Sequence, residues 1–234
     1  MTHAQNHLYP LTSPQREIGF DQMLHPSLPL YNVGGYMQID GAVDPKLFEQ
    51  AVNLLVQRHD ALRTVLVPTS DMPMQTFLED LPITVPFHDF SGKNEPRQSA
   101  LAWMQEQFVQ PFDLYEKQLC RFALLKIDEN CFYGFNNNHH LIIDGWSFSL
   151  LTHSLAKIYT HKIQCQQIGP VAPSYLAFVK NDRAYIESDR YEVHRQYWLE
   201  KYQTLPEPLF TPRYLSGREV DQIPSERRAF TFFF

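Results

Sequence analysis

The length, composition and charge of the chain exclude several classes of protein. Its 234 residues include 20 basic and 26 acidic side chains, which gives a formal net charge of −6, and 44% of the residues are apolar. A chain of this size and composition can bury a sizeable core, so we expect one or two globular domains and no intrinsic disorder. The mildly acidic balance, without a basic block, offers no electrostatic surface to nucleic acid.

The sequence also contains no signal for secretion or membrane insertion. The first ten residues lack a basic segment followed by an apolar stretch. The longest apolar run, at 100–104, is far shorter than the roughly 20 residues that span a bilayer. The three cysteines, Cys120, Cys131 and Cys165, have no metal-ligand spacing and are typical of reduced thiols. We therefore predict a cytoplasmic protein with no membrane partner and no bound metal.

Helical and alternating apolar patterns interleave along the chain. The spacing after Ser13 predicts a short helix, and alternation predicts a strand over 33–40. The expected apolar faces are Phe20, Met23 and Leu24 on the helix and Met37 and Ile39 on the strand.

The helix after Asp44 has the clearest pattern in the sequence. Asp44 can cap its N-terminus, and Pro45 occupies the first helical position, where a missing N–H costs nothing. Apolar residues then recur at the spacing of one buried face, namely Phe48, Ala51, Val52, Leu55 and Val56.

The middle of the chain is predicted to form short strands and one helix. The strands, separated by Pro and Asp residues, are expected at 64–67, 74–78 and 83–87. The helix is expected between about 96 and 110, and its buried face is Leu101, Met104 and Phe108.

Two strands and three helices follow. The segments 119–127 and 131–138 are apolar at nearly every position before a polar tip, as is typical of strands buried on both faces. Helices are predicted at 147–162, 174–187 and 189–202. Strands that alternate with helices in this way predict an α/β fold, a layered sandwich.

The last residues form an unusual apolar end. Residues 229–234 read Ala-Phe-Thr-Phe-Phe-Phe after a stretch punctuated by prolines. A free terminus this apolar is uncommon. We interpret it as the opening of a β-strand in a chain that is one part of a larger polypeptide.

Polar residues gather in the segment 136–147, where the last predicted strand ends. Ends of strands are where α/β folds build sites. The neighbours His139 and His140 point to opposite faces of a strand, so only one can face a given cleft. Asp144, just before Gly145 and a helical pattern, can cap that helix, accept a hydrogen bond from a buried Arg, or do both. The pattern alone leaves catalytic, structural and metal-binding roles open, with metal the weakest because no further ligand cluster is present.

The motif His139-His140-x-x-x-Asp144-Gly145 resembles the HHxxxDG signature of the condensation domains of nonribosomal peptide synthetases. The same signature occurs in wax-ester and diacylglycerol synthases. Further segments resemble condensation motifs in family order: SPQR at 13–16, RHDALRT at 58–64, PFDL at 111–114, LCR at 119–121, YLAF at 175–178 and YW at 197–198. The chain departs from the family pattern at Asp60, where Glu is usual, and at Gln118, where Pro is usual.

The resemblance implies a chloramphenicol-acetyltransferase-like fold with a mixed sheet flanked by helices. It covers only the first of the two halves of a condensation domain. It therefore implies an N-terminal condensation subdomain over 1–205. Residues 206–234 would form a linker and the start of a strand that leads to the absent C-terminal subdomain.

The activity that the resemblance implies is peptide-bond formation by an acyltransferase. An acyl or aminoacyl thioester donor would be joined to an acceptor amine, both carried on the 4'-phosphopantetheine arms of carrier proteins, with no cofactor bound by the domain itself. Because the first motif begins close to Met1, we expect the donor in trans, as in a starter or first-module domain, and an adenylation domain downstream. An acyl-CoA-dependent, ester-forming acyltransferase and a non-catalytic half that docks carrier proteins are the alternatives. Whether the isolated half is active stays open.

The resemblance also implies roles for individual residues. His140 matches the catalytic position, either as a general base or as the group that positions the amine. Asp144 matches a structural position paired with Arg63, and His139 would pack behind the site. Gly145 would let the acceptor arm approach the backbone. Candidates for the substrate tunnel are Trp146, Ser147 and Asn138, although a core position is the preferred interpretation of Trp146.

Overall fold

The structure is a computed structural model that describes residues 7–207. The chain divides into two units, Met1–Ser188 and Asp189–Phe234. The first contains both sheets, and the described part of the second consists mainly of the helix α6 (Asp189–Lys201). The predicted subdomain boundary at 205 stays a prediction, and the strand predicted at 229–234 lies outside the described residues.

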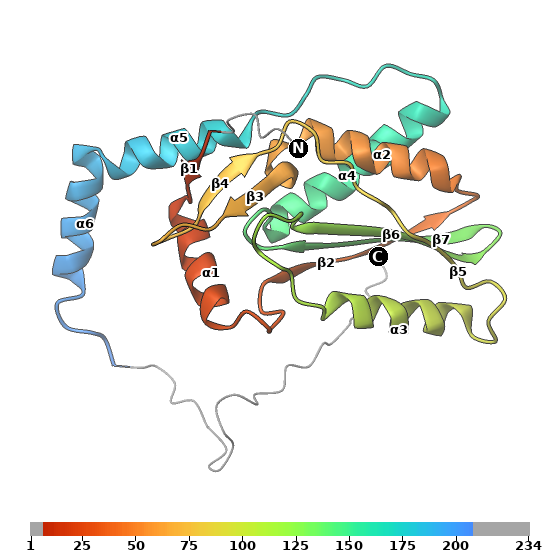
Figure 1. The fold of residues 1–234 in the computed structure, drawn as a ribbon, viewed down its shortest axis with the longest axis horizontal. Helices are drawn as coiled ribbons and strands as arrows, with labels where there is room; N and C mark the ends of the chain where they lie inside the picture. Colours follow the sequence, from red (N-terminus) through yellow and green to blue (C-terminus); the bar gives the residue numbers. More distant parts are fainter. Residues whose placement is uncertain (1–6, 208–234) are drawn as a thin grey trace, which may run out of the picture. The chain divides into compact units, whose positions relative to one another are not determined.

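The larger sheet has four strands in the order β2-β7-β6-β5 (Figure 1). The strands β2, β7 and β6 are mutually antiparallel, and the short β5 pairs with β6 in parallel, so the sheet is mixed. Their bounds are Asn32–Asp40 for β2, Phe87–Asp89 for β5, Cys120–Asp128 for β6 and Cys131–His139 for β7. Because β7 is an inner strand, all nine of its residues are buried, as the apolar run in the sequence predicts.

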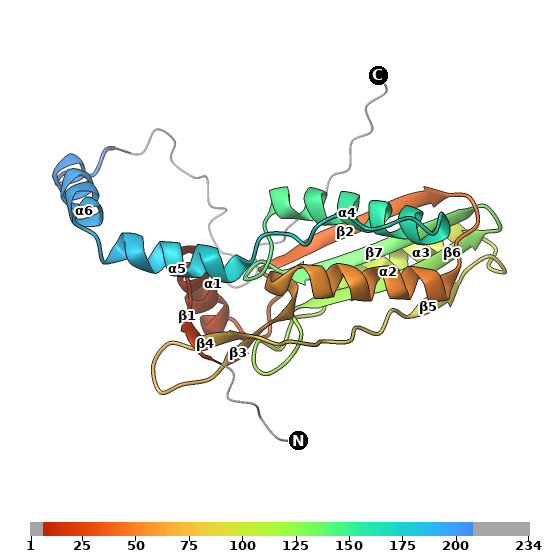
Figure 2. The same ribbon diagram turned by 90° about the horizontal axis from the view of Figure 1, so that it is seen from above.

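Helices cover both faces of this sheet. The helices α2 (Pro45–Arg58) and α4 (Gly145–Ile163) pack together on one face, and α3 (Pro96–Phe108) lies on the other (Figures 1 and 2). Each interface has its own apolar core, the larger one beneath α2 and α4 and the smaller one beneath α3. The predicted α/β fold with a mixed sheet flanked by helices is therefore confirmed.

A smaller antiparallel sheet has the order β1-β4-β3. Its strands are Tyr9–Pro10 (β1), Thr64–Val67 (β3) and Met74–Phe77 (β4). The remaining helical segments of the first unit are α1 (Ser13–Leu24), the short 3-10 helix η1 (Asp60–Arg63) and α5 (Tyr175–Ile186).

The helix α2 forms as the sequence predicts. The Asp44 carboxylate accepts the backbone N–H groups of Lys46 and Leu47, at 2.8 and 3.1 Å, and Pro45 occupies the first position. The five residues of the predicted apolar face are all buried. Full burial of a large apolar side chain contributes about 1.5–3 kcal/mol, so this face fixes the helix against the sheet.

The predicted buried face of α1 is wrong, although the helix itself is present. Phe20 and Leu24 are 57% and 61% exposed, and the buried residues are Gln15, Gly19 and Gln22. The two glutamines are buried because their side-chain amides hydrogen-bond inside the protein. The helix therefore turns a polar face inward.

The strand predicted at 83–87 is also wrong, because β5 begins only at Phe87. Ile83 and Val85 are nevertheless buried, and their backbone N–H groups donate to side chains of α2, those of Asn53 and Glu49. These side chains replace the ladder partners that a strand would need.

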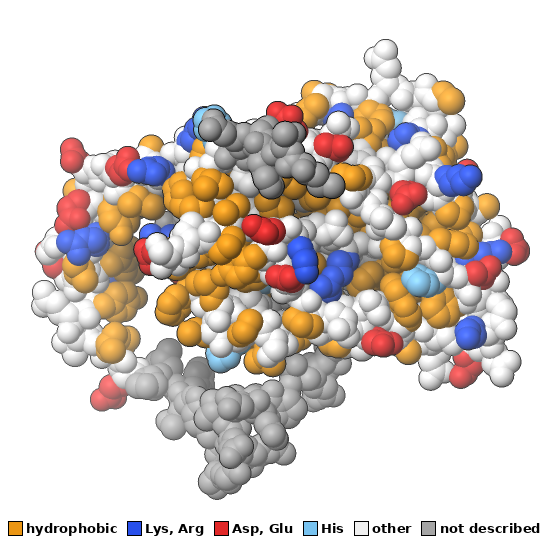
Figure 3. Space-filling view, viewed as in Figure 1, with side chains coloured by type: hydrophobic (Ala, Val, Ile, Leu, Met, Phe, Trp, Pro, Cys, Tyr) orange, Lys and Arg blue, Asp and Glu red, His pale blue; other side chains and the backbone are white. Residues whose placement is uncertain are grey.

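Charged side chains of both signs are interspersed on the face of the molecule shown in Figure 3, between patches of apolar side chains. None of the helices within residues 7–207 combines the length and the apolarity needed to cross a membrane.

Candidate active site

A cavity of about 540 Å³ lies where β7 ends and α4 begins. Three of the predicted site residues line it, His140, Asp144 and Ser147. The opposite walls come from α1, η1 and the start of α5 and include Gln15, Ala61, Tyr175 and Phe178. The residues that resemble the first, second and fourth condensation motifs are thus brought to one place.

The rim of this cavity is held by two aspartates. Asp60 accepts the backbone N–H of Tyr175 at 2.8 Å and the hydroxyl of Ser174, which joins η1 to the start of α5. Asp182 of α5 accepts the backbone N–H of Ser13 at 3.0 Å, at the start of α1. Asp60 stands where the motif usually has Glu, and in this chain its carboxylate holds two walls of the cavity together.

His140 presents a half-buried imidazole to the cavity. Its backbone N–H donates to the carbonyl of Tyr31 at 2.8 Å, and the two rings lie 6.4 Å apart in an edge-on arrangement. The Nδ1 atom is buried and has no hydrogen-bond partner among the described residues. The backbone therefore fixes where His140 sits, while no hydrogen bond within residues 7–207 fixes the tautomer of its ring.

His139 points away from the cavity and is 1% exposed. Its Nδ1 accepts the backbone N–H of Leu141 at 3.1 Å, so the neutral ring carries its proton on Nε2 and donates to Oε1 of Gln22 at 3.2 Å. Burial, together with the nearby charge of His140, lowers the pKa of His139 to about 4. His139 is therefore a neutral ring behind the site at physiological pH.

The turn that follows His139 is held by a second buried glutamine. Gln15 Nε2 donates to the carbonyl of Leu141 at 3.0 Å and to Gln75 Oε1 at 3.1 Å, and its Oε1 accepts the backbone N–H of Thr12 at 3.0 Å. Together with Gln22, it holds the turn that carries His140 from the α1 side. Neither glutamine was predicted to support the site. The available signal was the i, i+4, i+7 spacing of Gln15, Gly19 and Gln22, which places them on one helix face.

Asp144 caps α4, and the expected pair with Arg63 is not formed. The Asp144 carboxylate is exposed and accepts the backbone N–H of Ser147 at 2.6 Å, and the hydrogen bonds from Ser147, with the nearby charge of His140, lower its pKa. Arg63 instead donates to the carbonyls of Val56, Leu78 and Glu79. These carbonyls satisfy the guanidinium locally, so the predicted ion pair is wrong for this structure.

The remaining predicted site residues differ in their surroundings. Gly145 is exposed, and a Cβ built on it would meet no atom within 4 Å. Trp146 is 79% exposed, so the core interpretation is wrong: the buried face of α4, which includes Leu151, lies on another side of the helix. Asn138 is fully buried inside the sheet, where it donates to the carbonyl of Val33, and it does not line the cavity.

The arrangement can perform proton transfer and can orient a small polar group. A half-buried imidazole faces a cavity at the N-terminus of a helix, and an imidazole is the side chain that most often serves in general acid–base chemistry. Within residues 7–207, no group of three or more His, Cys, Asp or Glu side chains is arranged to hold a metal ion.

Comparisons with known proteins identify the family. The sequence profile of the condensation domain matches residues 5–229. A dimodular nonribosomal peptide synthase of Bacillus subtilis (strain 168) is 32% identical over 200 residues, which are 85% of this chain and 8% of the relative. An isonitrile lipopeptide synthase of Streptomyces coeruleorubidus is 30% identical over 205 residues, which are 87% of this chain and 14% of that relative.

Solved structures agree with this match. The starter condensation domain of rhizomide synthetase superposes with a TM-score of 0.81 at 27% identity, over 86% of this chain and 49% of that one. The first condensation domain of the CDA synthetase gives a TM-score of 0.75 at 25% identity, over 86% of this chain and 52% of that one. The chain thus spans about half the length of these solved domains, and it belongs to the condensation-domain family of nonribosomal peptide synthetases.

Proposed function

We propose that this chain is the N-terminal half of an amide-forming condensation domain. Condensation domains are acyltransferases, and their substrates are carried on phosphopantetheine arms of carrier proteins. In this proposal an acyl or aminoacyl thioester is the donor and an amine on a second carrier protein is the acceptor. The observation that carries the proposal is the position of His140. Its imidazole lies in a cavity whose other walls are α1, η1 and α5, and these elements contain the segments that resemble condensation motifs.

His140 acts on the acceptor amine in this proposal. An α-amine has a pKa near ~8, so part of it is already uncharged at neutral pH, and the rest needs a base. A neutral imidazole can accept that proton or hold the amine against the thioester carbon. The unpartnered Nδ1 supports this role, because the ring makes no hydrogen bond within the described protein that the reaction would have to break.

Gly145 gives the acceptor arm room to approach. No atom lies within 4 Å of the position of its missing Cβ, and the backbone of the first turn of α4 is exposed there. The exposed Trp146 follows directly, so a side of α4 beside the site is open in this chain. In the proposal this surface meets the acceptor arm and the second half of the domain.

The starter type is the version of the reaction that we propose. The rhizomide starter condensation domain is similar to this chain, and a structure of a variant of that domain contains C8-CoA and Leu-SNAC. By analogy, the donor here would arrive in trans, on a separate carrier protein or as an acyl-CoA. A second condensation half and an adenylation domain are further proposed partners, because the synthases matched above are far longer than this chain.

Product analysis tests the proposal. The chain is assayed alone and fused to the second half of the rhizomide starter domain, which serves unmodified as the positive control. An acyl thioester is offered with an aminoacyl thioester or with a matched alcohol, and products are identified by mass spectrometry. Amide from the amine supports the proposal. The proposal is contradicted if ester is the main product. It is also contradicted if a fusion that circular dichroism shows to be folded forms no amide.

A further inference from the structure

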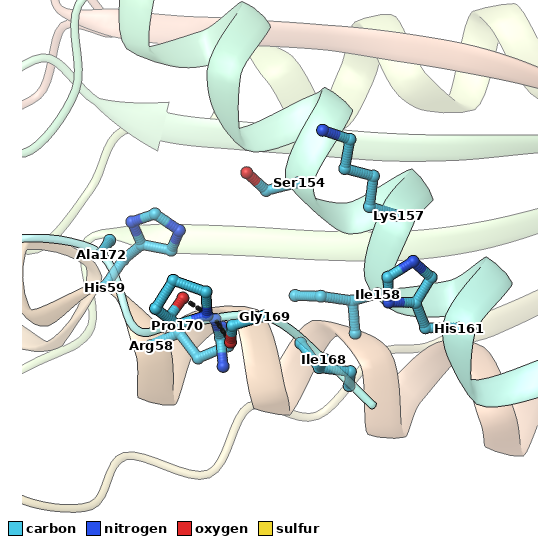
Figure 4. Close-up of a pocket in the computed structure, with 10 residues that line it drawn as sticks. All are labelled: Arg58, His59, Ser154, Lys157, Ile158, His161, Ile168, Gly169, Pro170 and Ala172. Atoms are coloured by element: carbon cyan, nitrogen blue, oxygen red, sulfur yellow. Dashed lines mark hydrogen bonds between the residues drawn. The ribbon is translucent and has the colours of Figure 1, made fainter. Parts of the chain in front are cut away.

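A second cavity of about 420 Å³ lies on the face of the larger sheet that α2 and α4 cover (Figure 4). Its walls are the C-terminal end of α2, the second half of α4 and the segment 168–172. It shares His59 with the candidate active site, so the two cavities are neighbours. Apart from His59, none of its lining residues belongs to the active-site cavity described above.

The charge of this cavity has one sign. Four basic side chains line it, Arg58 and His59 from the end of α2 and Lys157 and His161 from α4. No Asp or Glu is among its lining residues. In Figure 4 Arg58 and His59 come from one side, and Lys157, His161 and Ser154 from the other. A solvated surface usually mixes both signs, so a pocket with four bases and no acid favours an anion.

Several polar atoms of this cavity lack partners within residues 7–207. Nδ1 of His161 is buried without a hydrogen bond. Lys157 forms no ion pair in this part of the chain, and Ser154 provides a hydroxyl beside it. Arg58 differs, because its Nη2 donates to the carbonyls of Gly169 and Pro170 and so holds the wall of the cavity in place. Arg58 thus fixes the wall at 168–172, while Ser154, Lys157 and His161 line the cavity from α4.

Burial within this cavity affects His59. Burial first, and then the charge of Arg58, lowers the pKa of His59, against the smaller opposing effect of the neighbouring Asp60 carboxylate. An anion bound between His59 and Lys157 would reverse this effect, since a nearby negative charge favours the protonated imidazole. The rest of the lining is apolar and includes Ile158, Ile168 and Ala172. A ligand that fills this space therefore has a compact anionic group and an apolar portion.

We propose that this cavity binds a phosphate-bearing small molecule. The lining offers two permanently charged side chains, two imidazoles and a hydroxyl. A phosphate has several oxygens and a charge of up to −2, so it matches this set of donors better than a carboxylate with a single charge does. The phosphate could belong to a pantetheine arm, to the nucleotide of coenzyme A, or to inorganic phosphate. The proposal does not depend on amide formation, because binding is measured without donor or amine.

Calorimetric titration of the 234-residue chain tests this proposal and distinguishes the sources. The probes are inorganic phosphate, 4'-phosphopantetheine, dephospho-coenzyme A and coenzyme A. Equal affinity for the last three would assign the 4'-phosphate. Tighter binding of coenzyme A than of dephospho-coenzyme A would assign the 3'-phosphate. Binding of inorganic phosphate alone would assign a free-phosphate site, and no binding of any probe overturns the proposal.

Paired variants locate the binding. Lys157→Gln is expected to weaken binding about tenfold, the loss typical of one charge-assisted contact, and Ser154→Ala should weaken it less. Lys180→Gln, on α5 and outside the cavity, removes the same charge and should leave binding unchanged. Histidine NMR should show the pKa of His59 rising with ligand and the ring signals of His161 changing. Equal loss in both lysine variants, or no change at either histidine, would contradict binding in this cavity.

Discussion

Acid should destabilise this protein through His139, because the folded state holds its ring neutral. The ring is 1% exposed and hydrogen-bonded at both nitrogens, as acceptor from Leu141 and as donor to Gln22. Protonation would place a charge in this site and remove the acceptor that Leu141 needs. The perturbation is a fall in pH, and its effect on the free energy of unfolding is compared between the natural protein and His139→Asn. The Asn side-chain oxygen can still accept the hydrogen bond from Leu141.

The expected magnitude follows from the pKa of His139. It is about 4 in the folded protein, against an ordinary value of 6.5 that the unfolded chain should show. The unfolded state therefore binds more protons between these values, so this contribution is fully present above pH 6.5 and is lost as the pH falls towards 4. At about 1.4 kcal/mol per pH unit, the loss amounts to about 3 kcal/mol.

Urea unfolding followed by circular dichroism measures this effect. Free energies of unfolding are compared at pH 7 and pH 4 for the natural protein, for His139→Asn and for the control His153→Asn, which replaces an exposed histidine of α4. Loss of carboxylate interactions is common to all three proteins and cancels in the comparison. The natural protein and the control should lose about 3 kcal/mol more than His139→Asn. An equal acid loss in all three would refute the reasoning.

Three further variants test the site at its supports. Asp144→Ala should lower the free energy of unfolding, measured by urea titration, by about 1 kcal/mol, the usual cost of losing an N-cap. A loss above about 3 kcal/mol would instead indicate the buried ion pair that the structure lacks. Gln15→Ala should cost about 1–3 kcal/mol, because it removes the donor to the Leu141 carbonyl and to Oε1 of Gln75. An unchanged midpoint would show that this network is dispensable. Gly145→Val should keep the melting temperature within a few degrees, since space is open there, but should raise KM for a carrier-bound acceptor; unchanged kinetics would remove Gly145 from the acceptor path.

The sequence was sufficient where apolar periodicity and burial coincide. In α2 the N-cap, the proline and the five buried residues all follow from the pattern, because the helix packs only apolar side chains against the sheet. The inner strands β6 and β7 were predicted within one residue at each end for the same reason. The motif containing His140 likewise located the candidate cavity, since the end of an inner strand is fixed by the sheet.

The sequence was insufficient where tertiary hydrogen bonds override hydrophobicity. In α1 the apolar residues Phe20 and Leu24 are exposed, because Gln15 and Gln22 find partners inside the protein. Some of these partners lie far away in the chain, namely Gln75, His139 and Leu141. Arg63 could not be placed either, since the nearby carbonyls that hold it become neighbours only when β4 ends beside η1. The helical spacing of Gln15 and Gln22 marks a shared face but does not identify their partners, and the contacts of Arg63 leave no periodic trace at all.

One comparison of the amide formed by two proteins tests the role of His140 most directly. The fused domain and its His140→Ala variant are mixed with an acyl thioester and an aminoacyl thioester, and the amide formed in a single turnover is measured by mass spectrometry. His140 lines the cavity and its Nδ1 makes no hydrogen bond within residues 7–207, so the variant should fold normally. We predict that its rate falls by ~10²–10⁴-fold, as for loss of a general base. An equal rate in the folded variant would contradict a catalytic role for His140.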